Sequence, residues 1–208
     1  MSNINLNQIL SRDVLVSGTA AACFTGSRPK DLHGYGHDAY LPLVDFLTDL
    51  ILDLNQQGVG RFISGGAQGF DQLAFWSVNR AKAASPDITN DVYVPFPFQA
   101  VRWRDEGLFG QKEYNLMLSK ADRVRTLSDD PDPDDFRQAV QKLHARNHAM
   151  VDDSNLVIAL LVTGYNDDWR HSKGGTAECV RYAMSRNKPV LALRYDLTTR
   201  TVKAGFLS

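Results

Sequence analysis

The sequence predicts a doubly wound α/β fold, with a mostly parallel sheet that carries helices on both faces. Two observations lead to this prediction. Short runs rich in β-forming residues recur along the chain, and they are largely continuous in apolar character, which is typical of strands buried on both faces of a parallel sheet. Segments with helical periodicity lie between these runs, so strands and helices alternate.

The elements follow one another in a regular order. Strands are predicted within residues 21–27, 61–66, 91–96, 123–128, 155–162 and 189–194. Apolar residues at helical spacing predict helices within residues 43–54, 70–81, 136–151 and 177–184. We expect residues 1–208 to form a single domain, in which 1–19 are an N-terminal arm and 195–208 a C-terminal extension.

The composition argues against several classes of partner. Lys and Arg total 23 against 24 for Asp and Glu, so the net charge of −1 provides no global field for nucleic acid or an anionic membrane. The longest apolar stretch, 156–162, is far shorter than the roughly 20 residues that span a bilayer. We therefore expect a cytoplasmic protein with no membrane contact. Cys23 and Cys179 are too few for a disulfide framework and are expected to be small buried hydrophobes.

Three strand ends lead into turns that suit a phosphate. The segments are "FTGSRP", "SGGAQGFD" and "SKGGTAE", and the last two open helices. Glycine allows the backbone to approach a ligand closely, and the amide groups of a helix N-terminus favour an anion. Each turn alone is typical of an ordinary helix cap. Together, at one edge of one sheet, they favour a phosphorylated ligand that lies across the strand tips.

Other motifs are missing from the sequence. No G-x-G-x-x-G follows the first strand and no G-x-x-x-x-G-K-[ST] loop occurs, which disfavours hydride transfer with a nicotinamide cofactor and ATP hydrolysis. We expect no cofactor. His144 and His148 have the spacing of metal ligands on a helix, but no third ligand stands near them in the sequence, so no metal site is predicted.

An ordered set of motifs carries a family resemblance. The segments "FTGSRP", "SGGAQGFDQLA", "VPFPFQAVRWRDE", "ARNHAMVDDSNLVIAL" and "GGTAECVRYA" resemble those of the SLOG superfamily over residues 21–193. This Rossmann-like group includes the YpsA-like proteins, DNA-processing protein A and the lonely guy phosphoribohydrolases. The likeness is closest to the YpsA-like branch.

The resemblance implies a pocket for a nucleotide or nucleotide-derived ligand at the strand tips. Asp71 would either accept a hydrogen bond from a ribose hydroxyl or complement the helix dipole. A bulky side chain at Gly66 is expected to occupy the place of the phosphate. The matching positions are Gly26, Ser27, Arg28, Gly65, Gly66, Gly69, Asp71, Arg146, Asn147, Gly174, Gly175, Thr176 and Glu178.

Two loops contain aromatic residues that could add ligand selectivity. One offers Trp103 and Arg104, and the other offers Tyr165 and Trp169. Aromatic side chains beside phosphate turns either stack on a base or pack their loops down. The sequence leaves both alternatives open.

Three functions are consistent with the sequence. The first is a binding protein for a nucleotide-derived small molecule, acting as a sensor, a sequestering protein or a regulator. The alternative is a phosphoribohydrolase that cleaves the N-glycosidic bond, with Glu178 as catalytic residue. Phosphoribohydrolases carry the carboxylate where this chain has Cys179, and a shift of one residue turns a helical side chain by about 100°. A module for single-stranded DNA is the further alternative, and a homo-oligomer is compatible with all three.

Overall fold

The computed structural model describes residues 4–8, 10, 15, 20–103, 107–132 and 134–207. In this part of the chain, seven strands form one sheet in the order β4-β3-β2-β1-β5-β6-β7. Every neighbouring pair is parallel except β6 and β7. The strands are β1 (Ala20–Thr25), β2 (Val59–Ser64), β3 (Thr89–Val94), β4 (Arg123–Thr126), β5 (Leu156–Val162), β6 (Val190–Asp196) and β7 (Thr201–Phe206).

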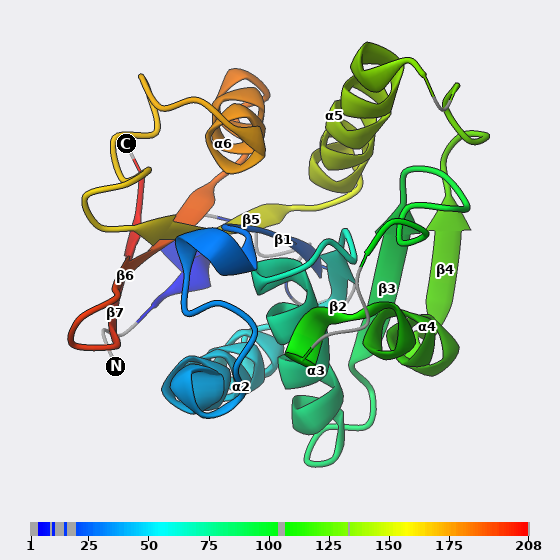
Figure 1. The fold of residues 1–208 in the computed structure, drawn as a ribbon. Helices are drawn as coiled ribbons and strands as arrows, with labels where there is room; N and C mark the ends of the chain where they lie inside the picture. Colours follow the sequence, from blue (N-terminus) through cyan, green and yellow to red (C-terminus); the bar gives the residue numbers. More distant parts are fainter. Residues whose placement is uncertain are drawn as a thin grey trace.

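Helices cover both faces of the sheet, which confirms the predicted doubly wound fold (Figure 1). Three helices lie against one face and two against the other. On the first face are α2 (Leu41–Gln56), α3 (Phe70–Lys82) and α4 (Gln111–Lys120), and on the second are α5 (Phe136–Asp152) and α6 (Gly175–Ser185).

The central strands are buried on both faces, as their continuous apolar runs predict. Successive side chains of a strand point to opposite faces. In β1, Ala22 and Phe24 pack toward α2 and α3, whereas Ala21 and Cys23 pack toward α5 and α6. Cys23 and Cys179 are free, fully buried cysteines, and burial raises the pKa of the Cys23 thiol to about 12. The prediction that both are small buried hydrophobes is confirmed.

The edges of the sheet differ from the sequence-based expectation. The run that forms β4 carries two arginines, and all four of its residues are exposed, because β4 is an edge strand rather than a doubly covered one. β7 was not predicted as a strand. It pairs with β6 in antiparallel register and extends the sheet with part of the segment expected to be a C-terminal extension. Its alternation of exposed and half-buried residues is typical of an edge.

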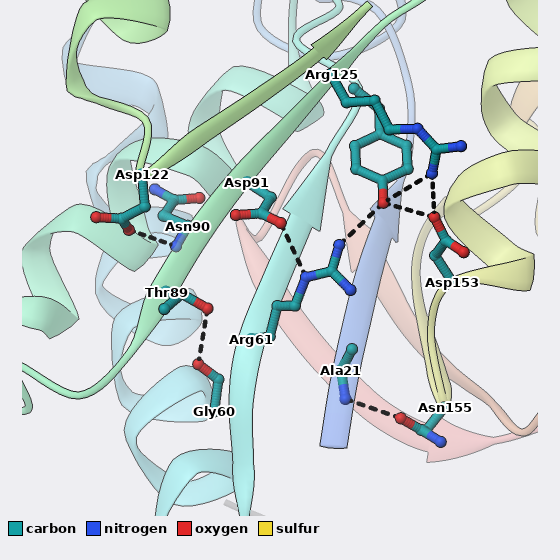
Figure 2. Close-up of polar contacts among 11 residues, drawn as sticks. Ala21, Gly60, Arg61, Thr89, Asn90, Asp91, Asp122, Arg125, Asp153 and Asn155 are labelled. Carbon is teal, nitrogen blue, oxygen red and sulfur yellow. Dashed lines mark hydrogen bonds and ion pairs between the residues drawn. The ribbon is translucent and has the colours of Figure 1, made fainter. Parts of the chain in front are cut away.

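A network of hydrogen bonds and ion pairs connects the C-terminal end of α5 to the sheet (Figure 2). The Tyr93 hydroxyl accepts a hydrogen bond from Arg61 Nη2 at 2.9 Å and donates one to Asp153 Oδ2 at 2.6 Å. Arg61 also pairs with Asp91 at 2.8 Å, and Arg125 bonds Asp153 at 2.5 Å. Since Asp153 caps the C-terminus of α5, this network positions the helix that brings Arg146 to the strand tips.

The described positions of the predicted N-terminal arm contact the domain. Leu6 and Leu15 are buried in the same core cluster as α2. Residues 1–3, 9, 11–14 and 16–19 of this arm lie outside the described residues. Among the helices that the structure describes, none is both long enough and apolar enough to cross a membrane.

Candidate ligand-binding site

A cavity of about 400 Å³ opens at the point where the order of the strands reverses. From β1 the chain proceeds outward through β2 to β4, and β5 then returns to the other side of β1. The loops after β1 and β5 therefore diverge, and such switch points are where open α/β sheets bind ligands. The lining residues are Thr25, Gly26, Ser27, Arg28, Lys30, Asp31, Ala67, Asp71, Val140, Leu143, His144, Arg146, Asn147, Tyr165, Asn166, Lys173, Gly174, Gly175 and Thr176.

A buried ion pair forms the floor of the cavity. Arg146 on α5 and Asp71 in the first turn of α3 are both more than nine-tenths buried, with Arg146 Nη1 3.4 Å from Asp71 Oδ2. Arg146 Nη1 also donates to the carbonyl oxygen of Gly65, and Asp71 accepts from the amide of Ala67. Arg146 Nε is buried without a hydrogen-bond partner within the described part of the chain. This arginine is therefore only partly satisfied by the protein.

Arg28 supplies a second guanidinium at the cavity wall. Burial lowers its pKa below the ordinary arginine value, while the charge of Asp71 opposes that shift. Arg28 still carries its charge at neutral pH, because an arginine pKa lies far above this range. The structure contains no hydrogen bond or ion pair to this guanidinium from any described residue. Arg28 is thus available to an anion in the cavity.

The electrostatic balance of the lining is positive although the whole chain is slightly negative. Four cationic side chains, those of Arg28, Lys30, Arg146 and Lys173, face two carboxylates, those of Asp31 and Asp71. Burial raises the pKa of the Asp71 carboxyl, and Arg146 and Arg28 oppose this rise. The cavity therefore concentrates positive charge locally.

The N-terminus of α6 adds backbone donors to the same cavity. Gly174, Gly175 and Thr176 line it, and Gly174 caps the helix without a side-chain hydrogen bond. The first amide groups of a helix have no partner within the helix, and their dipoles favour an anion. Asn147 lies close by, with its amide nitrogen 3.7 Å from where a Gly175 side chain would begin.

Three of the predicted glycines serve close packing. A Cβ at Gly26 would come within 2.7 Å of Phe70 Cβ, and one at Gly69 would come 2.5 Å from the carbonyl oxygen of Ser27. One at Gly65 would collide with the Arg146 guanidinium. Of the three, only Gly26 lines the cavity. These glycines let the loop after β1, the start of α3 and Arg146 come together.

Gly66 points away from the cavity. Its Cβ position faces Met117 Cε at 2.9 Å, Tyr114 Cε2 at 3.2 Å and Val92 Cγ1 at 3.3 Å, on the side of α4. The expectation that a side chain here would take the place of a phosphate is wrong, because the positive φ of 65° turns the position toward the core.

Gly66→Leu is therefore expected to destabilise the fold rather than to block the cavity selectively. The left-handed backbone costs about 1–2 kcal/mol for a side chain, and overpacking adds about 1–3 kcal/mol. Denaturant unfolding measures the loss. Gly34→Leu is the matched control, since Gly34 has a similar φ of 73° but no atom within 4 Å of its Cβ position. Equal stability of the two variants would contradict the packing argument.

Glu178 does not line the cavity; it is hydrogen-bonded to His148 of α5 and lies close to His144 of the same helix. Its Oε1 lies 2.5 Å from His148 Nε2, and its Oε2 lies 3.0 Å from His144 Nδ1. The His148 ring in turn stacks on Tyr182, with 3.7 Å between ring centroids. The spacing of the two histidines thus serves contact between α5 and α6. Across the described ranges, no three His, Cys, Asp or Glu side chains are arranged as metal ligands.

Of the three aromatic residues that the two loops offer, two pack into the protein and one lines the cavity. Trp169 is buried and Trp103 is half-buried against the Tyr114 ring, so both pack their loops down. Arg104 lies outside the described residues. Tyr165 lines the cavity and is 55% exposed, which leaves its ring free to stack on a ligand.

Several lining residues were not predicted from the sequence. Asn166 bonds both the Val162 amide and the Ser27 hydroxyl, and so joins the loops after β5 and β1. Lys30 and Lys173 are each within two residues of a predicted site residue, and this closeness in the sequence could have identified them. The same signal applied to His144, two residues before Arg146, and to Asn166, directly after Tyr165.

Comparison with known proteins shows the family of the chain. The family model described as the YspA SLOG family matches residues 22–197. The chain belongs to the YspA SLOG family. The predicted resemblance to the YpsA-like branch is thereby confirmed.

One relative of this YspA SLOG protein comes from Bacillus subtilis (strain 168). It is described as an uncharacterized SPbeta prophage-derived protein, YoqJ, and is 32% identical over 152 residues, which cover 69% of this chain and 81% of the relative. The X-ray structure of TM1055, a structural genomics target, matches 83% of this chain and 72% of its own, with 16% identity and a TM-score of 0.40. This structural likeness is too weak to support an argument.

Proposed function

We propose that this YspA SLOG protein binds a nucleotide or nucleotide-derived ligand in the cavity, as a sensor, a sequestering protein or a regulator. The observation that carries the proposal is Arg146, a buried arginine in the cavity wall whose Nε has no partner among the described residues. Leaving a buried charged donor unsatisfied is costly, and an anionic group in the cavity would remove that cost.

Further features support a nucleotide rather than a bare phosphate ion. The cavity of about 400 Å³ falls in the range of roughly 300–1,000 Å³ that is typical of small-molecule sites. Arg28 and the start of α6 offer charge and backbone donors to a phosphate, while Tyr165 offers an aromatic face to a base. Asp71 offers a carboxylate to a ribose hydroxyl.

The position of Glu178 favours binding of the nucleotide without hydrolysis. A phosphoribohydrolase needs a carboxylate that faces the ribose as positive charge develops there. In this chain the Glu178 carboxylate contacts His144 and His148 instead. The DNA-binding alternative has less support, because the chain has a net charge of −1 and binding to nucleic acid depends mainly on positive charge that contacts the phosphates.

The proposal is tested with a panel of nucleoside mono- and diphosphates, cyclic nucleotides and ADP-ribose. A ligand that binds only the folded protein raises the unfolding temperature, by an amount set by its concentration relative to Kd. We expect at least one member to stabilise the chain and to be recovered intact by chromatography. Stabilisation by none of them would contradict the proposal, and release of free base that disappears in Glu178→Ala would favour the hydrolase.

Arg28→Ala is expected to separate binding from stability. A charge-assisted hydrogen bond contributes about 1.5–3 kcal/mol, so affinity for the stabilising ligand should fall by roughly 10- to 150-fold. The free protein should keep its stability, because no described residue bonds this guanidinium. Calorimetric titration and denaturant unfolding measure the two quantities. Unchanged affinity would show that Arg28 does not contact the ligand.

A further inference from the structure

A second cavity, of about 490 Å³, is formed by the loops after β3 and β4 and the start of α5. The loops after β3 and β4 lie side by side next to the start of α5 (Figure 1), and the Phe98 amide bonds Asp130 across them. We call this cavity the acidic groove. Its lining residues are Phe96, Phe98, Gln99, Val101, Arg102, Asp130, Pro131, Asp132, Asp134, Asp135, Phe136 and Ala139.

The walls of the acidic groove are unusually apolar for an exposed surface. Phe98, Val101 and Phe136 are 65%, 59% and 79% exposed. Single exposed apolar residues are ordinary, but a contiguous apolar surface with a polar rim marks an interaction site. Exposed aromatic rings of this kind are typical anchors in protein interfaces.

The rim of the groove is negatively charged. Four aspartates line it, Asp130, Asp132, Asp134 and Asp135, against one arginine, Arg102, which already has an interaction partner. Charge complementarity steers a positively charged partner toward such a rim and repels an acidic one. The combination of rim and walls therefore suits a partner that presents both apolar and basic side chains.

The environment of the Gln99 side chain favours a peptide as the partner of the groove. Gln99 is about nine-tenths buried in the wall of the groove, and neither Nε2 nor Oε1 has a hydrogen-bond partner among the residues that the structure describes. A buried amide normally finds partners for both its donor and its acceptor. An extended peptide residue presents an N–H and a C=O on the same side, as in the paired residues of an antiparallel ladder. Such a residue could satisfy both ends of the Gln99 amide.

We propose that the acidic groove docks an extended segment of another protein in which apolar residues alternate with lysine or arginine. The apolar side chains enter between Phe98 and Phe136, the basic ones meet the aspartate rim, and the backbone pairs with the Gln99 amide. This docking does not depend on the nucleotide cavity, because none of the residues that line the acidic groove also lines that cavity.

The test uses the full chain and fluorescently labelled synthetic peptides. One set alternates lysine or arginine with leucine, phenylalanine or valine; a second set replaces the basic residues by glutamate, and a third replaces the apolar residues by serine. Fluorescence anisotropy should detect saturable binding of members of the first set only. Binding of no member of the first set, or equal binding of the glutamate set, would overturn the proposal.

Substitutions in the groove distinguish docking of the peptide in the groove from unspecific attraction between opposite charges. Phe136→Ala should weaken peptide binding roughly tenfold or more, as expected for an interface anchor. Leu116→Ala, which truncates a 51% exposed residue of α4, is the matched control and should leave binding unchanged. Asp132→Asn should weaken binding and reduce its salt dependence, whereas Asp49→Asn on α2 should not.

Gln99→Leu gives the sharpest outcome, because stability and binding should move in opposite directions. Removing an unsatisfied buried amide should raise the unfolding temperature, and loss of the backbone contact should weaken the peptide several-fold. Unchanged binding by both Gln99→Leu and Phe136→Ala would place the peptide elsewhere and overturn the proposal. Dimer dissociation caused by Phe136→Ala in size-exclusion chromatography would instead assign the groove to a second copy of the chain.

Discussion

Arg146→Ala is expected to abolish ligand binding and to destabilise the free protein strongly. Breaking a buried ion pair by removing one partner costs about 3–5 kcal/mol, because the remaining charge is left uncompensated. Here the remaining charge is Asp71, and the carbonyl oxygen of Gly65 also loses a donor. Denaturant unfolding at neutral pH measures the loss of stability, and titration with the stabilising nucleotide measures the loss of affinity.

The same variant should show a characteristic pH dependence. Burial raises the pKa of Asp71 and Arg146 opposes the rise, so removal of Arg146 should raise it further above the unfolded value of about 3.9. A carboxyl with a raised folded pKa binds its proton more tightly in the folded state, so its destabilising effect grows as the pH rises from the unfolded pKa to the folded pKa. The difference in unfolding free energy between wild type and variant should therefore shrink as the pH falls from the folded Asp71 pKa of the variant to the lower folded pKa of wild type, both of which lie above the unfolded value.

Arg186→Ala is the control for the Arg146 variant. Arg186, the C-cap of α6, lies 3.5 Å from Asp152, and both side chains are exposed to solvent. An exposed pair contributes less than about 1 kcal/mol. A loss of stability in Arg146→Ala no larger than that in Arg186→Ala would contradict the role of the buried pair.

Gly65→Ala is expected to have the second-largest effect on nucleotide affinity, although it adds only one methyl group. That methyl would collide with the Arg146 guanidinium and approach Asp71 Oδ2 to 2.7 Å. The buried Arg146 guanidinium must shift to make room for the methyl group, and overpacking of this kind costs about 1–3 kcal/mol. Displacement of the guanidinium should reduce nucleotide affinity nearly as much as Arg146→Ala does.

A double-mutant cycle checks the cause of the Gly65 effect. In the Arg146→Ala background the clash with the guanidinium is gone and only the approach to Asp71 Oδ2 remains, so Gly65→Ala should then cost less than it does in wild type. Gly205→Ala in β7 is the single-site control, because its Cβ position has no atom within 4 Å. Additive losses in the double variant would show that Gly65 acts independently of Arg146.

Much of the fold follows from local patterns in the sequence. The apolar runs and helical stripes locate six strands and the helices α2, α3, α5 and α6, because burial on both faces or on one stripe imposes its own periodicity. The glycine turns identify the loops after β1 and β5 as a site, because parallel strands bring their carboxyl ends to one edge. Strand β7 and helix α4 were not predicted, because the segments that form them are short and only weakly apolar.

The candidate site was only partly predictable for the same reason. Nine predicted residues line the cavity: Gly26, Ser27, Arg28, Asp71, Arg146, Asn147, Gly174, Gly175 and Thr176. Whether they contact a nucleotide stays a prediction. Motif spacing shows where a residue stands along the chain, but not which distant side chain it meets.

By itself, the sequence determined the alternation of strands and helices, the edge of the sheet that carries the glycine turns, and the family. The tertiary structure alone decided the directions of individual side chains. Gly66 faces Met117, Glu178 meets His144 and His148, and Arg146 reaches Asp71 across 75 residues of chain. The physical reason is that backbone periodicity and turn chemistry are local properties, whereas each of these contacts is made when separate elements pack against one another.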